Sequence, residues 1–218
     1  MPAALFDLDE TLLDRSGALK AFTHWQANEI LGASSNLQND FVARFIELDQ
    51  KGMVWKDEVY NSLVKEFDLS DHSVDDLLDT YLNKFCDFYL PRKGAFDVIN
   101  AYQQKGFKLG LVSNGKTPFQ EKNFQALGFG GYFDCVLVSE AVGLRKPDKA
   151  IFELASAEIK TPACDCVFIG DNPIADIQGA KNAGMTTVYV PVGPDVTSGE
   201  FADHTFSDLS ELANHIKQ

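Results

Sequence analysis

The sequence predicts an α/β fold: a parallel sheet with helices on both faces, interrupted near its start by a helical insertion. Short apolar runs alternate with helical stretches at both ends of the chain, a pattern typical of a parallel sheet that is covered on both sides. Residues 14–91 instead show helical periodicity without strand-like alternation. A length of 218 residues accommodates one domain and a modest insertion. We therefore expect an α/β core from residues 1–13 and 92–218, with a helical domain at residues 14–91.

The expected strands are the apolar runs outside the helical segment, at residues 4–8, 107–112, 135–138, 166–169 and 187–190. Helices are expected between and after these strands, at residues 94–105, 118–127, 148–157, 174–183 and 209–217. In a parallel sheet of this kind, ligands bind beyond the carboxyl ends of the strands. The residues that follow each strand are therefore the first candidates for a functional site.

The inserted segment predicts a small helical bundle. A first helix is expected at residues 16–31, ending near Gly32. Three further groups of apolar residues each recur on one face of a helix: Phe41, Val42, Phe45 and Ile46; Val59, Leu63 and Phe67; and Val74, Leu77, Leu78, Tyr81, Phe85 and Phe88.

The composition disfavours two classes of partner. A net charge of −13 argues against nucleic acids and membrane surfaces, since both are anionic. No apolar run approaches the roughly 20 residues that span a bilayer, and no signal-peptide core precedes Asp7, so a cytoplasmic location is expected. The four cysteines lack the pattern of a closed zinc site and are interpreted as reduced, buried thiols. The sequence leaves the oligomeric state open.

Two aspartates, Asp7 and Asp9, directly follow the first expected strand. Carboxylates at the end of an apolar strand are costly unless they are exposed, paired or metal-bound. Solvated acids in an ordinary turn are the simpler interpretation of one such pair by itself.

The second expected strand leads into the run Ser113-Asn114-Gly115 ahead of a helix. Thr117 and Gln120 form the pattern of a capping box, with Pro118 at the first helical position. Outward-pointing N–H groups and the helix dipole make such a turn suitable for an anion. An ordinary strand-to-helix turn is the alternative.

Two more polar positions follow later strands. Lys146 lies after the third expected strand and supplies a compact cation that suits a phosphate oxygen. Asp171 follows the fourth strand, and Asp176 lies in the first turn of the next helix. Each position has an ordinary explanation, a solvated lysine or an acid at a helix start. Because a parallel sheet brings the strand ends to one crevice, the four together predict a single site.

These residues resemble the four motifs of the haloacid dehalogenase-like hydrolase superfamily. The motifs are Asp7-Leu8-Asp9-Glu10-Thr11, Ser113-Asn114, Lys146, and Gly170-Asp171 with Asp176. The resemblance covers essentially the whole chain and is closest to the phosphatases of the superfamily. It implies a Rossmann-like core and an inserted α-helical cap domain between the first and second motifs.

The resemblance also implies roles for individual residues. Asp7 would attack phosphorus and form an aspartyl-phosphate that water then hydrolyses. The Asp7 carboxylate, the Asp9 backbone carbonyl and Asp171 would hold Mg²⁺, supported from behind by Thr11 and Asp176. The phosphoryl group would be bound by Lys146, Ser113 and Asn114.

Asp9 would act as general acid and then as general base, which requires a raised pKa and a cap that excludes water. Dehalogenases and phosphonate-cleaving relatives lack an aspartate at this position, so Asp9 favours a phosphatase.

Two alternatives remain open. A sugar-phosphate mutase of the same superfamily would share the core but return the phosphoryl group to its substrate. A phospho-accepting receiver domain combines similar residues, but it is shorter, lacks the insertion and carries its acceptor after a later strand. The expected substrate is a small phosphorylated metabolite, although no nucleotide, sugar or glycolate signature is present.

Residues 50–56 connect two helices of the insertion and, by analogy with similar caps, are a candidate specificity loop. Gly52 permits a tight turn, Trp55 offers an apolar surface, and Lys51 and Lys56 add positive charge. On this hypothesis Lys51→Ala and Gly52→Pro change the ranking of substrates and spare stability. A simple connector with Trp55 in the core is the alternative.

Overall fold

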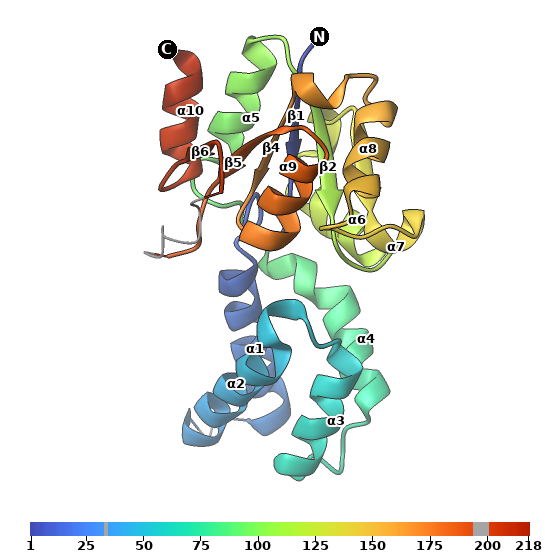
Figure 1. Cartoon of the computed structure of the whole chain (residues 1–218). Helices are drawn as coiled ribbons and strands as arrows, with labels where there is room; N and C mark the ends of the chain where they lie inside the picture. The colour runs from blue at the N-terminus through green and yellow to red at the C-terminus, as the bar shows by residue number, and fades with distance from the viewer. Residues whose placement is uncertain (33–34, 194–200) are drawn as a thin grey trace. The chain divides into compact units, whose positions relative to one another are not determined.

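The computed structural model describes residues 1–32, 35–193 and 201–218 (Figure 1). The chain divides into two compact units. One combines Met1–Asp14 with Pro91–Gln218 and is built around a sheet, and the other, Arg15–Leu90, is helical. No helix in the described ranges is long and apolar enough to cross a membrane.

The strands of the first unit are β1 (Ala3–Phe6), β2 (Lys108–Ser113), β3 (Cys135–Val138), β4 (Cys166–Gly170), β5 (Thr186–Tyr189) and β6 (His204–Thr205). They form one sheet in the order β3-β2-β1-β4-β5-β6, and every neighbouring pair in it is parallel. β1 lies between β2 and β4, and its last residue Phe6 pairs with Leu111 on one side and Ile169 on the other. The predicted parallel sheet is confirmed.

The helices of this unit are α5 (Ala95–Gln104), α6 (Phe119–Ala126), α7 (Ser139–Val142), α8 (Lys149–Glu158), α9 (Gly179–Asn182) and α10 (Leu209–Lys217). Helices cover both faces of the sheet, as predicted. On one face α5 packs beside α10 (Figure 1), and Tyr102 of α5 makes an edge contact with Phe6. On the other face Leu5 belongs to a core cluster with Phe152 of α8 and Ala180 of α9. Successive β1 side chains thus point to opposite layers, as a strand requires.

The second unit contains α1 (Arg15–Leu31), α2 (Ser35–Asp49), α3 (Lys56–Glu66) and α4 (Val74–Lys84). Its core is aromatic: the ring of Phe22 meets the rings of Tyr81, Phe85 and Phe88 edge-on. Phe85 and Phe88 lie in a 3₁₀ turn, η2 (Phe85–Phe88), and not on the helix that their spacing predicts. The predicted insertion of helices is confirmed.

The structure differs from the predictions in several local features. β6 and α7 are not predicted, because elements this short leave no periodic pattern in the sequence. The predicted helix at residues 174–183 is present, but its first part is π-helical, η5 (Pro173–Gln178), and only α9 is α-helical. The thiols of Cys135 and Cys166 are buried, but Cys164 is exposed and Cys86 is half-buried. The capping box fails because the Thr117 hydroxyl donates to Glu121 while Gln120 turns into the interior.

Candidate active site

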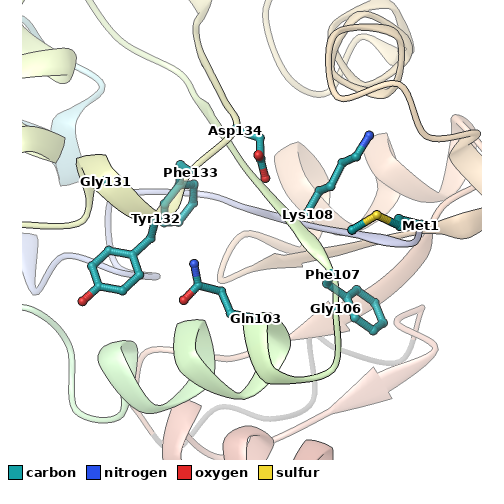
Figure 2. A pocket seen from close by; sticks show the side chains of 9 residues that line it. All are labelled: Met1, Gln103, Gly106, Phe107, Lys108, Gly131, Tyr132, Phe133 and Asp134. Atoms are coloured by element: carbon teal, nitrogen blue, oxygen red, sulfur yellow. The ribbon is translucent and has the colours of Figure 1, made fainter.

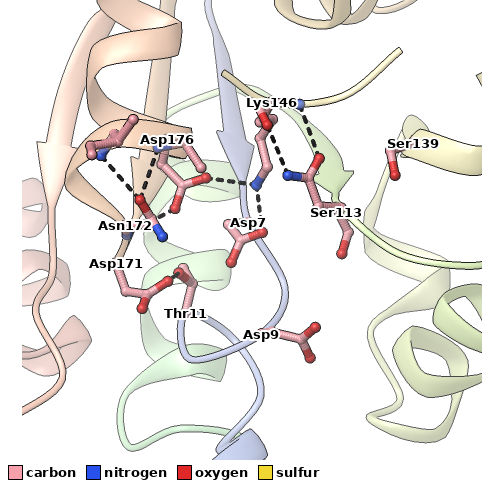
Figure 3. A network of polar contacts seen from close by, with 12 residues as sticks. Asp7, Asp9, Thr11, Ser113, Ser139, Lys146, Asp171, Asn172 and Asp176 are labelled. Atoms are coloured by element: carbon pink, nitrogen blue, oxygen red, sulfur yellow. Dashed lines mark hydrogen bonds and ion pairs between the residues drawn. The ribbon is translucent and has the colours of Figure 1, made fainter. Parts of the chain in front are cut away.

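The direction of the strand order reverses at β1. The chain moves from β1 to β2 and β3 on one side, then returns to β4 and β5 on the other. Such a switch point opens a crevice at the carboxyl ends of the strands. Asp7 directly follows β1 and Asp171 directly follows β4, and the Asp7 N–H donates to the Ile169 carbonyl at 3.0 Å. The two aspartates therefore flank this switch point (Figure 3).

Lys146 joins two of the predicted acids. Its Nζ lies 2.5 Å from Oδ1 of Asp7 and 2.7 Å from Oδ1 of Asp176 (Figure 3). All three side chains are almost fully buried. A buried ammonium group is stable here because two carboxylates compensate its charge.

Burial has opposite effects on these groups. It raises the pKa of Asp7 to about 7, although Lys146 opposes the shift. It raises the pKa of Asp171 to about 8, with further contributions from the charges of Asp7 and Asp176. Burial by itself would lower the pKa of Lys146, but Asp176 and Asp7 hold it above its ordinary value. The crevice thus holds more negative charge than Lys146 alone offsets.

The same carboxylates form a group that could hold a metal ion. One oxygen from each of Asp7, Asp171 and Asp176 lies within 4.8 Å of the others. Carboxylate oxygens are the hard ligands that Mg²⁺ prefers, and a divalent cation would offset the negative charge that the three buried carboxylates bring together. The Thr11 hydroxyl donates a long hydrogen bond of 3.5 Å to Oδ1 of Asp171. The donor set therefore fits a magnesium ion.

The loop after β4 orients Asp176. Oδ2 of Asp176 accepts the N–H of Asn172 at 3.0 Å, while the Asn172 side chain caps η5 through the N–H groups of Ile174 and Ala175. A Cβ at Gly170 would lie 2.4 Å from Oδ2 of Asp176. Only glycine fits at this position while Asp176 keeps its place beside Lys146.

Asn114 has a different contact from the one predicted. Its side-chain amide donates to the Lys146 carbonyl and accepts from the Lys146 N–H, both at 3.0 Å. Both ends of the amide therefore hold the loop that carries Lys146. The predicted phosphate contact of Asn114 stays a prediction, as does the role of Ser113, the last residue of β2.

Asp9 lies on a tight turn over residues 8–13. Glu10 has a positive φ of 61°, and the N–H groups of Leu12 and Leu13 both donate to the Leu8 carbonyl. Arg92 fixes this turn from outside, since its guanidinium contacts the carbonyl of Glu10 and its N–H donates to the carbonyl of Leu12. The sequence does not indicate this role for Arg92, because the whole inserted unit separates Arg92 from Glu10 along the chain.

Gln120 is a second residue that sequence reasoning missed. Its Nε2 donates to Oδ2 of Asp9 at 2.8 Å and to the Ser113 hydroxyl at 2.9 Å. The capping-box pattern assigned this side chain to the helix terminus. The structure instead places it between two predicted site residues.

A comparison with family models matches residues 4–190 to the haloacid dehalogenase-like hydrolases. The chain belongs to this family. The match covers most of the chain and includes the strands and loops that carry the aspartates and Lys146. The predicted family is confirmed.

Individual relatives extend the match to the full length of this hydrolase. It is 26% identical over 220 residues to a glyceraldehyde 3-phosphate phosphatase of Methanocaldococcus jannaschii, covering 98% of this chain and 96% of the relative. It is 29% identical to the pyrimidine 5′-nucleotidase PynA of Streptococcus pneumoniae, over 85% of this chain and 81% of the relative. The prediction of an enzyme of the phosphatase type is confirmed by these matches.

A solved structure shares the architecture. The hydrolase aligns with the putative HAD-hydrolase YfnB from Bacillus subtilis, determined bound to magnesium, with a TM-score of 0.75 and 28% identity. The alignment covers 100% of this chain and 99% of YfnB. Both units therefore have counterparts in a known member of the family.

A hollow of about 360 Å³ lies elsewhere on the sheet (Figure 2). Its lining includes Met1 ahead of β1, Lys108 at the start of β2 and Asp134 ahead of β3. These are the amino ends of the strands, opposite to the crevice that holds Asp7. The hollow is therefore not the predicted site.

The predicted specificity loop is only partly as expected. Lys51 is exposed, with a positive φ of 56°, and Trp55 is half-buried at the start of α3. Lys56, however, is buried and paired with Asp49, so it adds no charge to the loop surface. Gly52 has a φ of 85° and its N–H donates to Asp49, so proline cannot replace it without strain. The prediction that Gly52→Pro spares stability is wrong, and the role of the loop in substrate selection stays a prediction.

Proposed function

We propose that this hydrolase cleaves phosphomonoesters of small phosphorylated metabolites with Mg²⁺, through an aspartyl-phosphate on Asp7. The observation that carries the proposal is the arrangement of Asp7, Asp171 and Asp176 within 4.8 Å of one another, with the Lys146 ammonium between Asp7 and Asp176. Phosphoryl transfer requires positioning and neutralisation of the equatorial oxygens more than covalent chemistry. A nucleophile beside a cation and a metal site meets that requirement.

The carboxylates of Asp7 and Asp171 and the backbone carbonyl of Asp9 would hold the metal. Asp176 would support this site without binding the metal directly, because one of its oxygens contacts Lys146 and the other accepts from the N–H of Asn172. When bound, Mg²⁺ neutralises charge on the phosphoryl oxygens and favours the ionised form of Asp7.

Asp7 attacks phosphorus in line with the leaving oxygen, and the phosphorus–oxygen bond to the leaving group breaks. Lys146 and the Ser113 hydroxyl bind the equatorial oxygens, together with the N–H of Asn114. Asp9 gives its proton to the leaving oxygen. The ionised Asp9 then takes a proton from the water that cleaves the aspartyl-phosphate, which restores both carboxyl groups.

We also propose that residues 14–91 serve as the cap and that residues 1–13 with 92–218 form the catalytic core. A cap that excludes water lets Asp9 hold its proton and protects the aspartyl-phosphate until the leaving group has gone. The substrate class is supported by relatives that are named for a triose phosphate and for pyrimidine nucleotides.

The test is release of inorganic phosphate from a panel of an aryl phosphate, a triose phosphate and a nucleoside monophosphate, with Mg²⁺ or with EDTA. We expect release only with Mg²⁺, and slowing of about 10²- to 10⁴-fold for Asp9→Asn with alkyl esters. Equal phosphate release in EDTA would contradict the proposed requirement for Mg²⁺. Isomerised ester in place of free phosphate would favour a mutase.

A further inference from the structure

The Gln120 side chain lies at the start of α6 and is only 3% exposed. Its Oε1 accepts a hydrogen bond of 2.7 Å from Nδ2 of Asn123, which is itself 2% exposed. Its Nε2 faces Oδ2 of Asp9, the Ser113 hydroxyl and, at 3.5 Å, the Asn114 carbonyl. Because Asn123 Nδ2 donates to Oε1, the Gln120 atom that faces Asp9 is the nitrogen.

A primary amide has two N–H groups, and here they reach residues on two neighbouring strands. One bond goes to Asp9, after β1, at 2.8 Å, and the other goes to Ser113, at the end of β2, at 2.9 Å. A bond to Oδ2 sets the rotation of the Asp9 carboxylate, and so the direction of Oδ1. The Ser113 oxygen accepts from Gln120, which leaves its single O–H to be directed to another acceptor.

The backbone leaves space for this amide. A Cβ at Gly115 would lie 2.4 Å from Cγ and 2.9 Å from Cδ of Gln120. Gly115 is held in place by Ser139, whose hydroxyl accepts the Gly115 N–H at 3.0 Å. If the buried amide of Gln120 turned, it would leave polar atoms without hydrogen bonds, which costs free energy. This arrangement therefore fixes one orientation of Gln120.

We propose that Gln120 is a positioning residue of the reaction, orienting the Asp9 carboxylate toward the leaving oxygen and the Ser113 hydroxyl toward the phosphoryl group. This inference rests on the proposed function. Gln120 itself exchanges no proton with the substrate and acts only through its two partners.

The variant that tests this is Gln120→Met, which keeps the length of the side chain and removes both donors. Gln125→Met on the exposed face of the same helix is the matched control. The readout is kcat and KM for an aryl phosphate with a good leaving group and for an alkyl phosphate, whose leaving oxygen needs the proton of Asp9. We expect Gln120→Met to lower kcat for the alkyl ester by about 10- to 100-fold and for the aryl ester by less.

A double-mutant comparison separates positioning from packing. In the Asp9→Asn background the selective loss with the alkyl ester should disappear, because the group that Gln120 orients can no longer give a proton. An equal loss for both esters, or an unchanged selective loss with Asp9→Asn, would overturn the inference and leave the proposed function standing. No phosphate release by the unaltered protein from any ester would overturn both. Melting temperatures of the variants show whether a loss reflects unfolding.

Discussion

Lys146 and Asp7 form a buried ion pair, with 2.5 Å between Nζ and Oδ1 and side chains only 2% and 10% exposed. The pair joins the residue proposed as nucleophile to the cation proposed to bind phosphate. Its second partner, Asp176, makes Lys146 the counter-charge of two carboxylates. We therefore expect Lys146 to matter for the stability of the core as well as for the proposed reaction.

Lys146→Met should destabilise the core and abolish turnover. Loss of the cation leaves Asp7 and Asp176 without their shared counter-charge, and breaking a buried pair in this way costs about 3–5 kcal/mol. Chemical denaturation measures the change in the free energy of unfolding. Lys149→Met is the control, since Lys149 makes an exposed pair with Glu153, and it should change stability by less than about 0.5 kcal/mol. Similar losses in both variants would contradict the assignment.

Binding of Mg²⁺ should strengthen as the pH rises from about 6 to about 8.5. The carboxyl groups of Asp7 and Asp171 have raised pKa values of about 7 and about 8, and they must lose their protons before they can bind a cation. The increase in melting temperature on adding Mg²⁺ should therefore be small at the lower pH and larger at the higher one.

Asp171→Asn should remove most of this increase, whereas the exposed Asp165→Asn should keep it. An increase that is the same at both pH values, or that survives Asp171→Asn, would show that the ion binds elsewhere.

Asp49 should be the main electrostatic determinant of stability in the helical unit. It accepts two hydrogen bonds from Arg15, at 2.9 and 3.0 Å, and pairs with the buried Lys56. Burial by itself would raise the pKa of Asp49, but Arg15 and Lys56 hold its pKa below the usual range. A lowered pKa stabilises the fold above the unfolded value of about 3.9, and this contribution is lost as the pH falls through the folded value.

Asp49→Asn removes the carboxylate that both cations contact, and it should lower the free energy of unfolding by about 3–5 kcal/mol at neutral pH. As the pH is lowered below about 4, the free energy of unfolding of Asp49→Asn should fall by less than that of the unaltered protein. Glu47→Gln, on the exposed surface of α2, is the control. Equal acid sensitivity of the two variants would contradict this role for Asp49.

The sequence predicts most of the first unit because most of its strands are largely apolar, and β1, β2 and β4 are followed by polar residues. The crevice follows from those strand ends, so Asp7, Lys146, Asp171 and Asp176 come together as predicted. Gln120 and Arg92 could not be predicted in the same way. Their contacts with Asp9 and Glu10 depend on which strands become neighbours, and a local pattern misassigned Gln120 to a helix cap.

At residues 50–56, too, a local sequence pattern does not predict which side chains are buried. A lysine in a connecting segment indicates an exposed charge, yet the Lys56 side chain is only 2% exposed because it pairs with Asp49. Periodicity identifies the helix that contains Asp49 but not the direction of its side chain. Buried ion pairs of this kind are visible only in three dimensions.

The most direct test of the account is to identify the phosphorylated residue during turnover. The protein is mixed with a radiolabelled phosphomonoester and Mg²⁺, quenched in acid, and digested so that the labelled peptide can be identified. We predict hydroxylamine-sensitive label on the peptide that contains Asp7, and neither label nor phosphate release with Asp7→Asn, at an unchanged fold. Label on any other residue, or turnover by Asp7→Asn, would contradict the central claim that Asp7 carries the phosphoryl group.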